Sequence, residues 1–160
     1  MKKAGLVSLA VALCFVLAGL GIAASSGNHS ATVQVNAINE MGISGGNITL
    51  TINSATAGSE PDAQSDNTTC DLQWTTNEAS KKITVATDNG TPNFTLKILA
   101  ENVSGGTATS EVTLSTTATD FVASISTTVG SCDLKYTASA TAAQGTGSDA
   151  HTVTYTLTAA

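Results

Sequence analysis

Apolar and polar residues alternate along most of this chain with the period of two that is typical of β-strands. Turn signals rich in Gly, Asn and Ser separate the alternating runs, and helical periodicity is hard to find beyond the first 24 residues. The runs lie at 33–37, 48–52, 70–74, 83–85, 94–100, 112–114, 121–125, 132–138 and 153–159. Eight or nine short strands at this spacing predict an all-β fold, an antiparallel sandwich.

The N-terminus carries a different pattern. Lys2 and Lys3 precede an apolar run that ends in small residues between Gly21 and Ser26. This three-part pattern predicts a secretory signal peptide over residues 1–24, with a membrane anchor as the alternative. We therefore expect one secreted or surface-exposed domain over residues 25–160, with no membrane span after cleavage.

The charge balance excludes some partners. The whole chain has 6 basic and 12 acidic residues, and two of the basic residues are Lys2 and Lys3. The expected mature chain thus has 4 − 12 = −8 charges and no arginine. Such a chain lacks the basic patch that nucleic acids or anionic membranes require.

A six-residue phrase occurs twice in the chain. Cys70-Asp71-Leu72-Gln73-Trp74-Thr75 returns as Cys132-Asp133-Leu134-Lys135-Tyr136-Thr137, 62 residues later. Shorter matches follow the same order, including Ser-Gly-Gly at 44–46 and 104–106. The pattern favours an internal duplication with pseudo-repeats of about 31–90 and 91–160, although Thr-rich strands can also resemble one another by composition.

The two cysteines of the repeated phrase predict a disulfide. In an exported chain, Cys70 and Cys132 are expected to pair and so to join the two halves, with two buried free thiols as the alternative.

The halves differ at one place. Residues 57–67 are polar and contain Pro61, which indicates a loop, whereas the matching stretch contains the apolar strand pattern of 121–125. A sandwich with a strand in one half and a loop in the other would have an exposed edge, where another chain can add a strand.

Catalytic and metal-binding patterns are weak. His29 and His151 lie in no nucleophile motif, and Glu101 and Glu111 lack the aromatic floor of a sugar cleft, so we expect no enzyme and no cofactor. We also expect no metal site. The acidic stretch with Glu60, Asp62 and Asp66 offers oxygen ligands for calcium but lacks the spacing of a dedicated loop.

The C-terminus suggests a family. Gly147 is followed by the alternating residues Val153, Tyr155 and Leu157. This ending resembles the last strand of bacterial pilus subunits assembled by the chaperone–usher route, although Ala159 stands where those subunits usually carry an aromatic residue. The chain also resembles small secreted β-sandwich proteins of coat and biofilm type.

The resemblance implies an immunoglobulin-like (Ig-like) sandwich that lacks one strand. The N-terminal extension of the next subunit would complete it. In this chain that extension is residues 28–38, with the assembly-strand candidates Thr32, Val33, Val35 and Ala37.

The sequence therefore predicts a secreted, non-enzymatic structural or adhesive surface protein. It would be a fimbrial-like pilus, filament or coat subunit that self-associates, or joins other surface proteins, by β-strand addition. The alternative is a secreted carbohydrate-binding module, which would need an exposed aromatic residue such as Trp74 or Tyr155 to hold a glycan.

Overall fold

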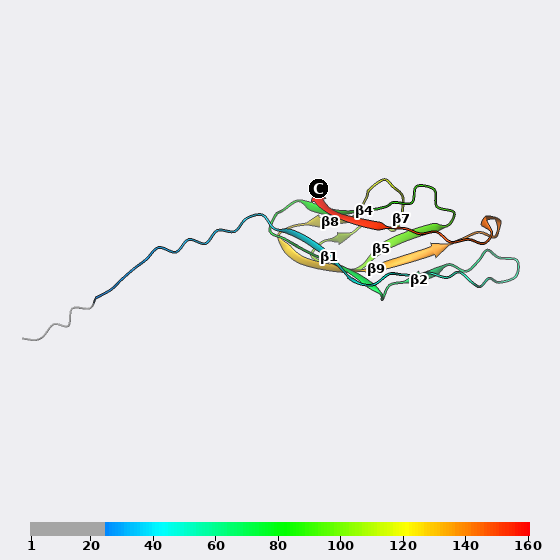
Figure 1. Cartoon of the computed structure of the whole chain (residues 1–160), viewed down its shortest axis with the longest axis horizontal. Helices are drawn as coiled ribbons and strands as arrows, with labels where there is room; N and C mark the ends of the chain where they lie inside the picture. Colours follow the sequence, from blue (N-terminus) through cyan, green and yellow to red (C-terminus); the bar gives the residue numbers. More distant parts are fainter. Residues whose placement is uncertain (1–24) are drawn as a thin grey trace, which may run out of the picture. The chain divides into compact units, whose positions relative to one another are not determined.

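The computed structural model describes residues 25–160 (Figure 1), so the predicted signal peptide lies outside the described residues. Val35–Ala160 form one compact unit, and the residues before it belong to a separate unit. Residues 25–38 contain neither helix nor strand.

The compact unit is an all-β sandwich of two antiparallel sheets (Figure 1). The first sheet contains β1 (Asn39–Gly45), β2 (Gln64–Asp66), β3 (Cys70–Thr76), β5 (Thr95–Ser104), β7 (Val112–Thr113) and β9 (Thr128–Ser139). The second contains β4 (Lys81–Thr87), β6 (Thr107–Ala108), β8 (Thr119–Ile125) and β10 (Val153–Ala159). One short 3₁₀ turn, Ala142–Gln144, lies between β9 and β10.

The strand order places β3 and β9 at the centre of the first sheet. That order is β1-β3-β9-β5-β7, with β2 also paired to β9. The second sheet has the order β10-β4-β8-β6. Within the described residues, β1 and β7 are thus edge strands of one sheet, and β10 and β6 are edge strands of the other.

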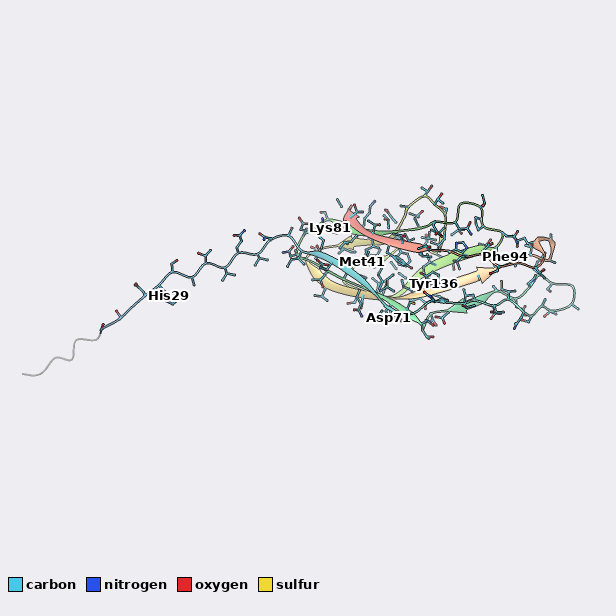
Figure 2. The ribbon with its side chains drawn as sticks, in the orientation of Figure 1. His29, Met41, Asp71, Lys81, Phe94 and Tyr136 are labelled. Carbon is cyan, nitrogen blue, oxygen red and sulfur yellow. The ribbon has the colours of Figure 1, made fainter. Side chains whose placement is uncertain are left out.

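The core lies between the sheets and is built by the alternation that the sequence predicts. In β3, Leu72 and Trp74 are buried while Gln73 and Thr75 are exposed. β4 and β9 alternate between buried and half-buried positions, and Ile83 and Leu134 are fully buried. Figure 2 draws these side chains on the ribbon of the sandwich. Each such side chain contributes about 1.5–3 kcal/mol by leaving water.

Two tyrosines join the sheets across the core. Tyr136 of β9 and Tyr155 of β10 share a hydrogen bond of 2.8 Å between their hydroxyls, and Phe121 of β8 packs against Tyr155 at 5.4 Å between ring centroids. Burial raises the pKa of both hydroxyls, so both stay protonated. This buried contact fixes the spacing of the sheets at one end of the sandwich.

The chain crosses from one sheet to the other after β7. Leu114 N–H donates to the Leu96 carbonyl of the first sheet, and Ser115 accepts from Thr87 N–H of the second. This crossing closes one side of the sandwich.

The predicted disulfide between Cys70 and Cys132 is absent, since both described cysteines are buried free thiols. Cys132 lies opposite Leu72, two residues along β3 from Cys70. The Cα atoms of such diagonal neighbours are about 7–8 Å apart, whereas the Cα atoms of two disulfide-bonded cysteines usually lie about 4.4–6.8 Å apart. Burial raises the pKa of both thiols, that of Cys132 to about 12.

The predicted asymmetry between the halves is present. Residues 119–125 form the full strand β8, whereas residues 57–67 form a loop with one isolated bridge between Ala55 and Pro61 and the three-residue strand β2. β2 pairs with β9 in the first sheet, so the loop supplies no strand to the second sheet.

The strands predicted at 33–37 and 48–52 are wrong. Both stretches alternate, but neither joins a ladder of the two sheets, and the first strand is instead β1. The 48–52 stretch lies beside the feature described next.

Candidate functional site

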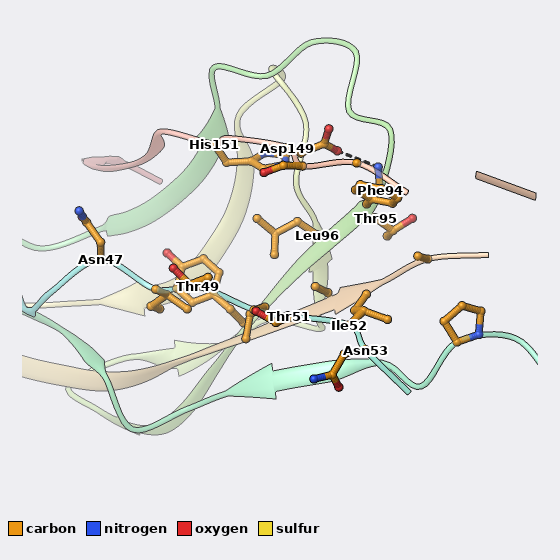
Figure 3. A pocket seen from close by; sticks show the side chains of 18 of the residues that line it. Asn47, Thr49, Thr51, Ile52, Asn53, Phe94, Thr95, Leu96, Asp149 and His151 are labelled. Carbon is orange, nitrogen blue, oxygen red and sulfur yellow. Dashed lines mark hydrogen bonds between the residues drawn. The ribbon is translucent and has the colours of Figure 1, made fainter. Parts of the chain in front are cut away.

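A groove of about 1200 Å³ opens at the end of the sandwich where β1 stops (Figure 3). We call it the edge groove. One wall is the segment 46–55 that follows β1, and the other is the segment 145–153 that leads into β10. The two walls continue neighbouring edge strands of the two sheets, because β1 is an edge of the first sheet, β10 is an edge of the second, and the two strands contact each other.

The first wall is extended and alternating. Ile48, Leu50 and Ile52 are half-buried, and Ile48 and Leu50 pack against the core. Thr49 and Thr51 are exposed, as expected when every second side chain faces solvent. The wall is anchored near its ends, where the Cys70 thiol donates to the Gly46 carbonyl at 2.9 Å and Asp62 N–H donates to the Ser54 carbonyl at 2.9 Å.

Gly45 allows this wall to leave the first sheet. Its φ is +97°, in the left-handed region that favours glycine. A Cβ at this position would lie 1.9 Å from the Thr69 carbonyl oxygen, so no larger residue fits. The Ser-Gly-Gly sequence at 44–46 was the available signal that the strand ends there.

The second wall is held by polar contacts to the end of β4 in the second sheet and to the residue that precedes β5 in the first sheet. Asp149 accepts a 2.7 Å hydrogen bond from Phe94 N–H, and His151 Nδ1 lies 3.1 Å from Thr87 Oγ1. Asp88 accepts from Thr152 N–H at 2.7 Å, which lowers the pKa of that carboxyl. These contacts place the wall in line with β10.

The floor of the edge groove is apolar and belongs to the first sheet. Leu96 of β5 and Tyr136 and Ala138 of β9 face it, with Phe94 at the outer end (Figures 2 and 3). Ile43 of β1 faces the groove at its inner end and is 52% exposed. An inward-facing isoleucine half open to solvent shows that side chains from this molecule do not fill the groove.

The N-terminal candidates lie outside both sheets. Val33 is 89% exposed and Val35 is 70% exposed, and Thr32 and Ala37 are also exposed. Residues 25–39 contain no Asp, Glu, Lys or Arg. This segment thus presents an uncharged, alternating and unburied strand sequence.

The segment is tied down next to β1. Asn77 Oδ1 accepts from Ile38 N–H at 2.7 Å, and Asn77 Nδ2 donates to the Asn36 carbonyl at 2.7 Å. Asn77 follows β3, at the end of β1 that lies opposite Thr76. The segment is therefore anchored at the end of β1 that is distant from the edge groove.

The C-terminal candidates form β10. Tyr155 is buried in the core, and Val153 and Leu157 are half-buried. β4 pairs with β10 on one side, and the other side faces β1 and, at Val153, the edge groove. The predicted strand exists, and it lies at a sheet edge.

The acidic stretch does not form a calcium site. The Asp66 carboxylate accepts from the backbone N–H of Thr68 and Thr69 and from the Thr69 hydroxyl, which lowers its pKa. Asp62 accepts from the Ser54 hydroxyl, and Glu60 accepts from Ala142 N–H. The three carboxylates thus have separate hydrogen-bond partners, and no group of metal-ligand residues converges anywhere in residues 25–160.

The residues considered for catalysis do not converge either. Glu101 pairs with Lys135 at 3.0 Å, and Glu111 pairs with Lys97 at 3.0 Å. The amide of Asn67 and the ammonium of Lys135 lower the pKa of Glu101. His29 is exposed in the N-terminal segment. Each carboxylate has an ordinary structural partner.

The aromatic side chains are turned inward. Trp74, Phe121, Tyr136 and Tyr155 are buried, and Phe94 is half-buried. A smaller hollow of about 520 Å³ lies beside Trp74, whose ring covers Gly130, and Trp74 Nε1 has no hydrogen-bond partner. The described surface therefore offers no exposed aromatic platform for a sugar ring.

Residues 25–160 include no helix long and apolar enough to cross a membrane. Comparison with known proteins found no matching family model, no similar curated protein and no matching solved structure.

Proposed function

We propose that this protein is a secreted, non-enzymatic structural or adhesive subunit, built on an Ig-like sandwich, that assembles by β-strand addition. The observation that carries the proposal is the edge groove, which lies between two extended walls where β1 ends and β10 begins and which the N-terminal segment of another copy would fill.

The chemistry of the groove fits a β-strand. An edge strand has unpaired backbone N–H and C=O groups that an added strand can bind, and alternating apolar side chains of that strand can then fill pockets below. Here Leu96, Tyr136 and Ile43 form an apolar floor. An incoming strand would cover Ile43 and complete the core at this end.

The Thr-rich surface supports the same function. The exposed positions of β10 include Thr154 and Thr156, and those of the first wall include Thr49 and Thr51. Threonine favours extended backbone and is polar. These segments can therefore pair with an added strand, and their side chains are well hydrated when no strand is bound. The carbohydrate-binding alternative is disfavoured because Trp74 and Tyr155, its expected sugar contacts, are buried.

The test compares two identical substitutions at exposed valines. Val35→Asp places a charge in the N-terminal segment, and Val129→Asp places one on β9, where the valine is 75% exposed. Neither valine is in the core, so both variants should fold. We expect Val35→Asp to abolish large assemblies in size-exclusion chromatography and negative-stain electron microscopy, while Val129→Asp assembles like the parent. Equal assembly by both variants would contradict the proposal.

A further inference from the structure

Asparagine in this chain repeatedly stands two positions before serine or threonine. The motif Asn-x-Ser/Thr, with any residue except proline in the middle, is the acceptor for N-linked glycans on surface segments of secreted proteins. Ten asparagines occur after residue 24, and six of them meet the motif without proline in the middle. The six are Asn28, Asn47, Asn67, Asn89, Asn93 and Asn102.

The number of motifs exceeds what the composition alone gives. Ser and Thr fill 43 of the 136 positions from 25 to 160, so about three of the ten asparagines would meet the motif by chance. The observed number is twice as large, which is the first observation that points to a glycan.

The structure divides the six motifs by the state of the side-chain amide. In a held group, Nδ2 already donates a hydrogen bond: Asn67 to Glu101 at 3.0 Å, Asn89 to the Ala150 carbonyl at 3.3 Å, and Asn102 to Asp133 at 2.6 Å. In an open group, Asn28, Asn47 and Asn93, the residue is exposed and the amide has no partner among residues 25–160.

We propose that the three asparagines of the open group are N-glycosylation sites, each of which takes an oligosaccharide on Nδ2 in the exported chain. The inference goes beyond the proposed function. It rests on the secretion that the proposed function includes, and it is independent of strand addition.

The reaction needs a donor of one chemical class, an oligosaccharide linked to a polyisoprenyl pyrophosphate. The amide nitrogen attacks the anomeric carbon, the bond from that carbon to the pyrophosphate oxygen breaks, and a carbon–nitrogen bond replaces it. The amide gives up one proton, and the lipid pyrophosphate leaves. In the held group a hydrogen bond must first be broken to free Nδ2, so the open group is the favoured acceptor.

Asn47 is presented on the outer side of the first wall. The wall is extended, so residues two positions apart share a side. Asn47 and Thr49 are both exposed, whereas Ile48 between them is half-buried and packs against the core. The amide and the hydroxyl of this motif thus face solvent together, as expected of a surface acceptor.

Asn93 lies in the loop that leads into β5, at the outer end of the edge groove. Its neighbour Phe94 lines the groove. A Cβ at Gly147 would lie 3.7 Å from Asn93 Nδ2, so a larger residue there would cover the amide. Figure 3 shows Asn47 toward one end of the groove and Phe94 toward the other. Glycans at Asn47 and Asn93 would therefore stand at the rim of the edge groove.

Asn28 lies in the N-terminal segment, where residues 28–30 are all exposed and form neither helix nor strand. It precedes the assembly-strand candidates, of which Thr32 is the first. A glycan on Asn28 leaves residues 32–37 unmodified, so this site is compatible with strand addition.

A glycan also suits the composition of the chain. Charged residues make up 11% of the sequence, against about 25% in typical soluble domains. An N-linked oligosaccharide is bulky and solubilising. Three of them would add to the hydration that Ser and Thr give this weakly charged surface.

The inference is tested by offering the folded mature chain to a purified transferase that recognises Asn-x-Ser/Thr, with a polyisoprenyl pyrophosphate-linked oligosaccharide as donor. Six short peptides, one for each motif, measure the reactivity of each sequence without the fold. Mass spectrometry of the digested chain gives the rate at each asparagine, and each rate is divided by that of the matching peptide.

We expect this ratio to be about tenfold higher in the open group than in the held group, because a hydrogen bond to a charged group lowers the population of free amides by about that factor. Equal ratios in the two groups would overturn the inference. So would a folded chain that stays unmodified at the open group while the peptides react.

A matched pair of variants tests whether the motif directs the transfer at Asn47. Thr49→Ala removes the motif hydroxyl from an exposed position and should abolish transfer to Asn47, whereas Thr49→Ser keeps the hydroxyl and should retain the transfer. Equal transfer to Asn47 in both variants would contradict the assignment.

The protein recovered from the cells that produce it gives the final test. We expect oligosaccharide mass on peptides that contain Asn28, Asn47 and Asn93. A secreted chain with only the mass of its unmodified sequence would overturn the inference and leave the assembly proposal intact. A chain that keeps residues 1–24 and stays inside the cell would overturn the secretion on which both proposals rest.

Discussion

The proposed assembly makes the two exposed valines of the N-terminal segment measurable contributors to affinity. Val33→Ala/Val35→Ala keeps the segment uncharged and extended and removes two methyl groups from each side chain. Burial of one CH₂-sized group is worth about 0.8 kcal/mol, or about 1.6 kcal/mol for each valine-to-alanine change. Only the part of each valine side chain that is exposed before assembly can contribute to this burial free energy.

The exposed fractions of 89% for Val33 and 70% for Val35 set the size of the effect. Multiplied by these fractions, the burial free energies lost become about 1.4 kcal/mol at Val33 and about 1.1 kcal/mol at Val35, or about 2.5 kcal/mol together. Since every 1.4 kcal/mol is tenfold in affinity, the dissociation constant for subunit addition should rise about 60-fold.

Sedimentation of assembled protein over a concentration series measures this change. The control is Val129→Ala, which removes the same groups from a valine on the outer face of β9 that is 75% exposed. We expect the concentration at which half the protein sediments to rise by one to two orders of magnitude for the double variant and to stay constant for the control. A double variant that assembles at the parent concentration would refute the reasoning, because the valines would then remain in water.

Three further predictions concern the sandwich itself. Asp71→Asn removes one of two like charges that lie opposite each other, since Asp133 faces Asp71 on the neighbouring strand. The free energy of unfolding, measured by denaturant titration, should rise by about 0.2–1 kcal/mol at low salt. A gain that persists undiminished in high salt would contradict the electrostatic cause. Tyr155→Phe leaves the buried Tyr136 hydroxyl without its partner and should lower the free energy of unfolding by about 1–3 kcal/mol. The double variant Tyr136→Phe/Tyr155→Phe should lose less stability than the two single variants added together. Strict additivity would show that the hydroxyls do not interact. The pKa of Cys132 is raised to about 12 from an ordinary value of 9.0, so its neutral form contributes stability that is fully present below pH 9 and is lost as pH rises toward 12. Cys132→Ala should weaken the loss of stability over that window, and an unchanged alkaline profile would refute this assignment.

The alternating pattern predicted most of the strands and the inward side chains. Leu72, Trp74, Ile83 and Leu134 are buried as their positions indicate. The pattern wrongly predicted strands at 33–37 and 48–52. A period of two shows which side chains share a face, but it does not show whether the backbone has a neighbouring strand to hydrogen-bond with. In residues 48–52 the apolar side chains do face inward, but no neighbouring strand is present.

The candidate site shows a similar division. The loop was predicted over 57–67 and is present at 57–63, because Pro61 and the polar residues around it do not continue a central strand, whereas Gln64–Asp66 form the short strand β2. The strand-accepting edge stays a prediction. The edge groove was not, because its two walls are about 100 residues apart in the sequence. The disulfide was wrongly predicted, since composition cannot reveal that Cys70 and Cys132 are diagonal neighbours in one sheet.

The central claim is that subunits join through the N-terminal segment. The most direct test is negative-stain electron microscopy with size-exclusion chromatography of the mature chain, compared with a variant that lacks residues 25–35 and keeps the Asn36–Ile38 anchor on Asn77. We predict filaments or large oligomers for the mature chain and a folded monomer for the variant. A mature chain that remains monomeric, or a shortened chain that still forms filaments, would contradict the account.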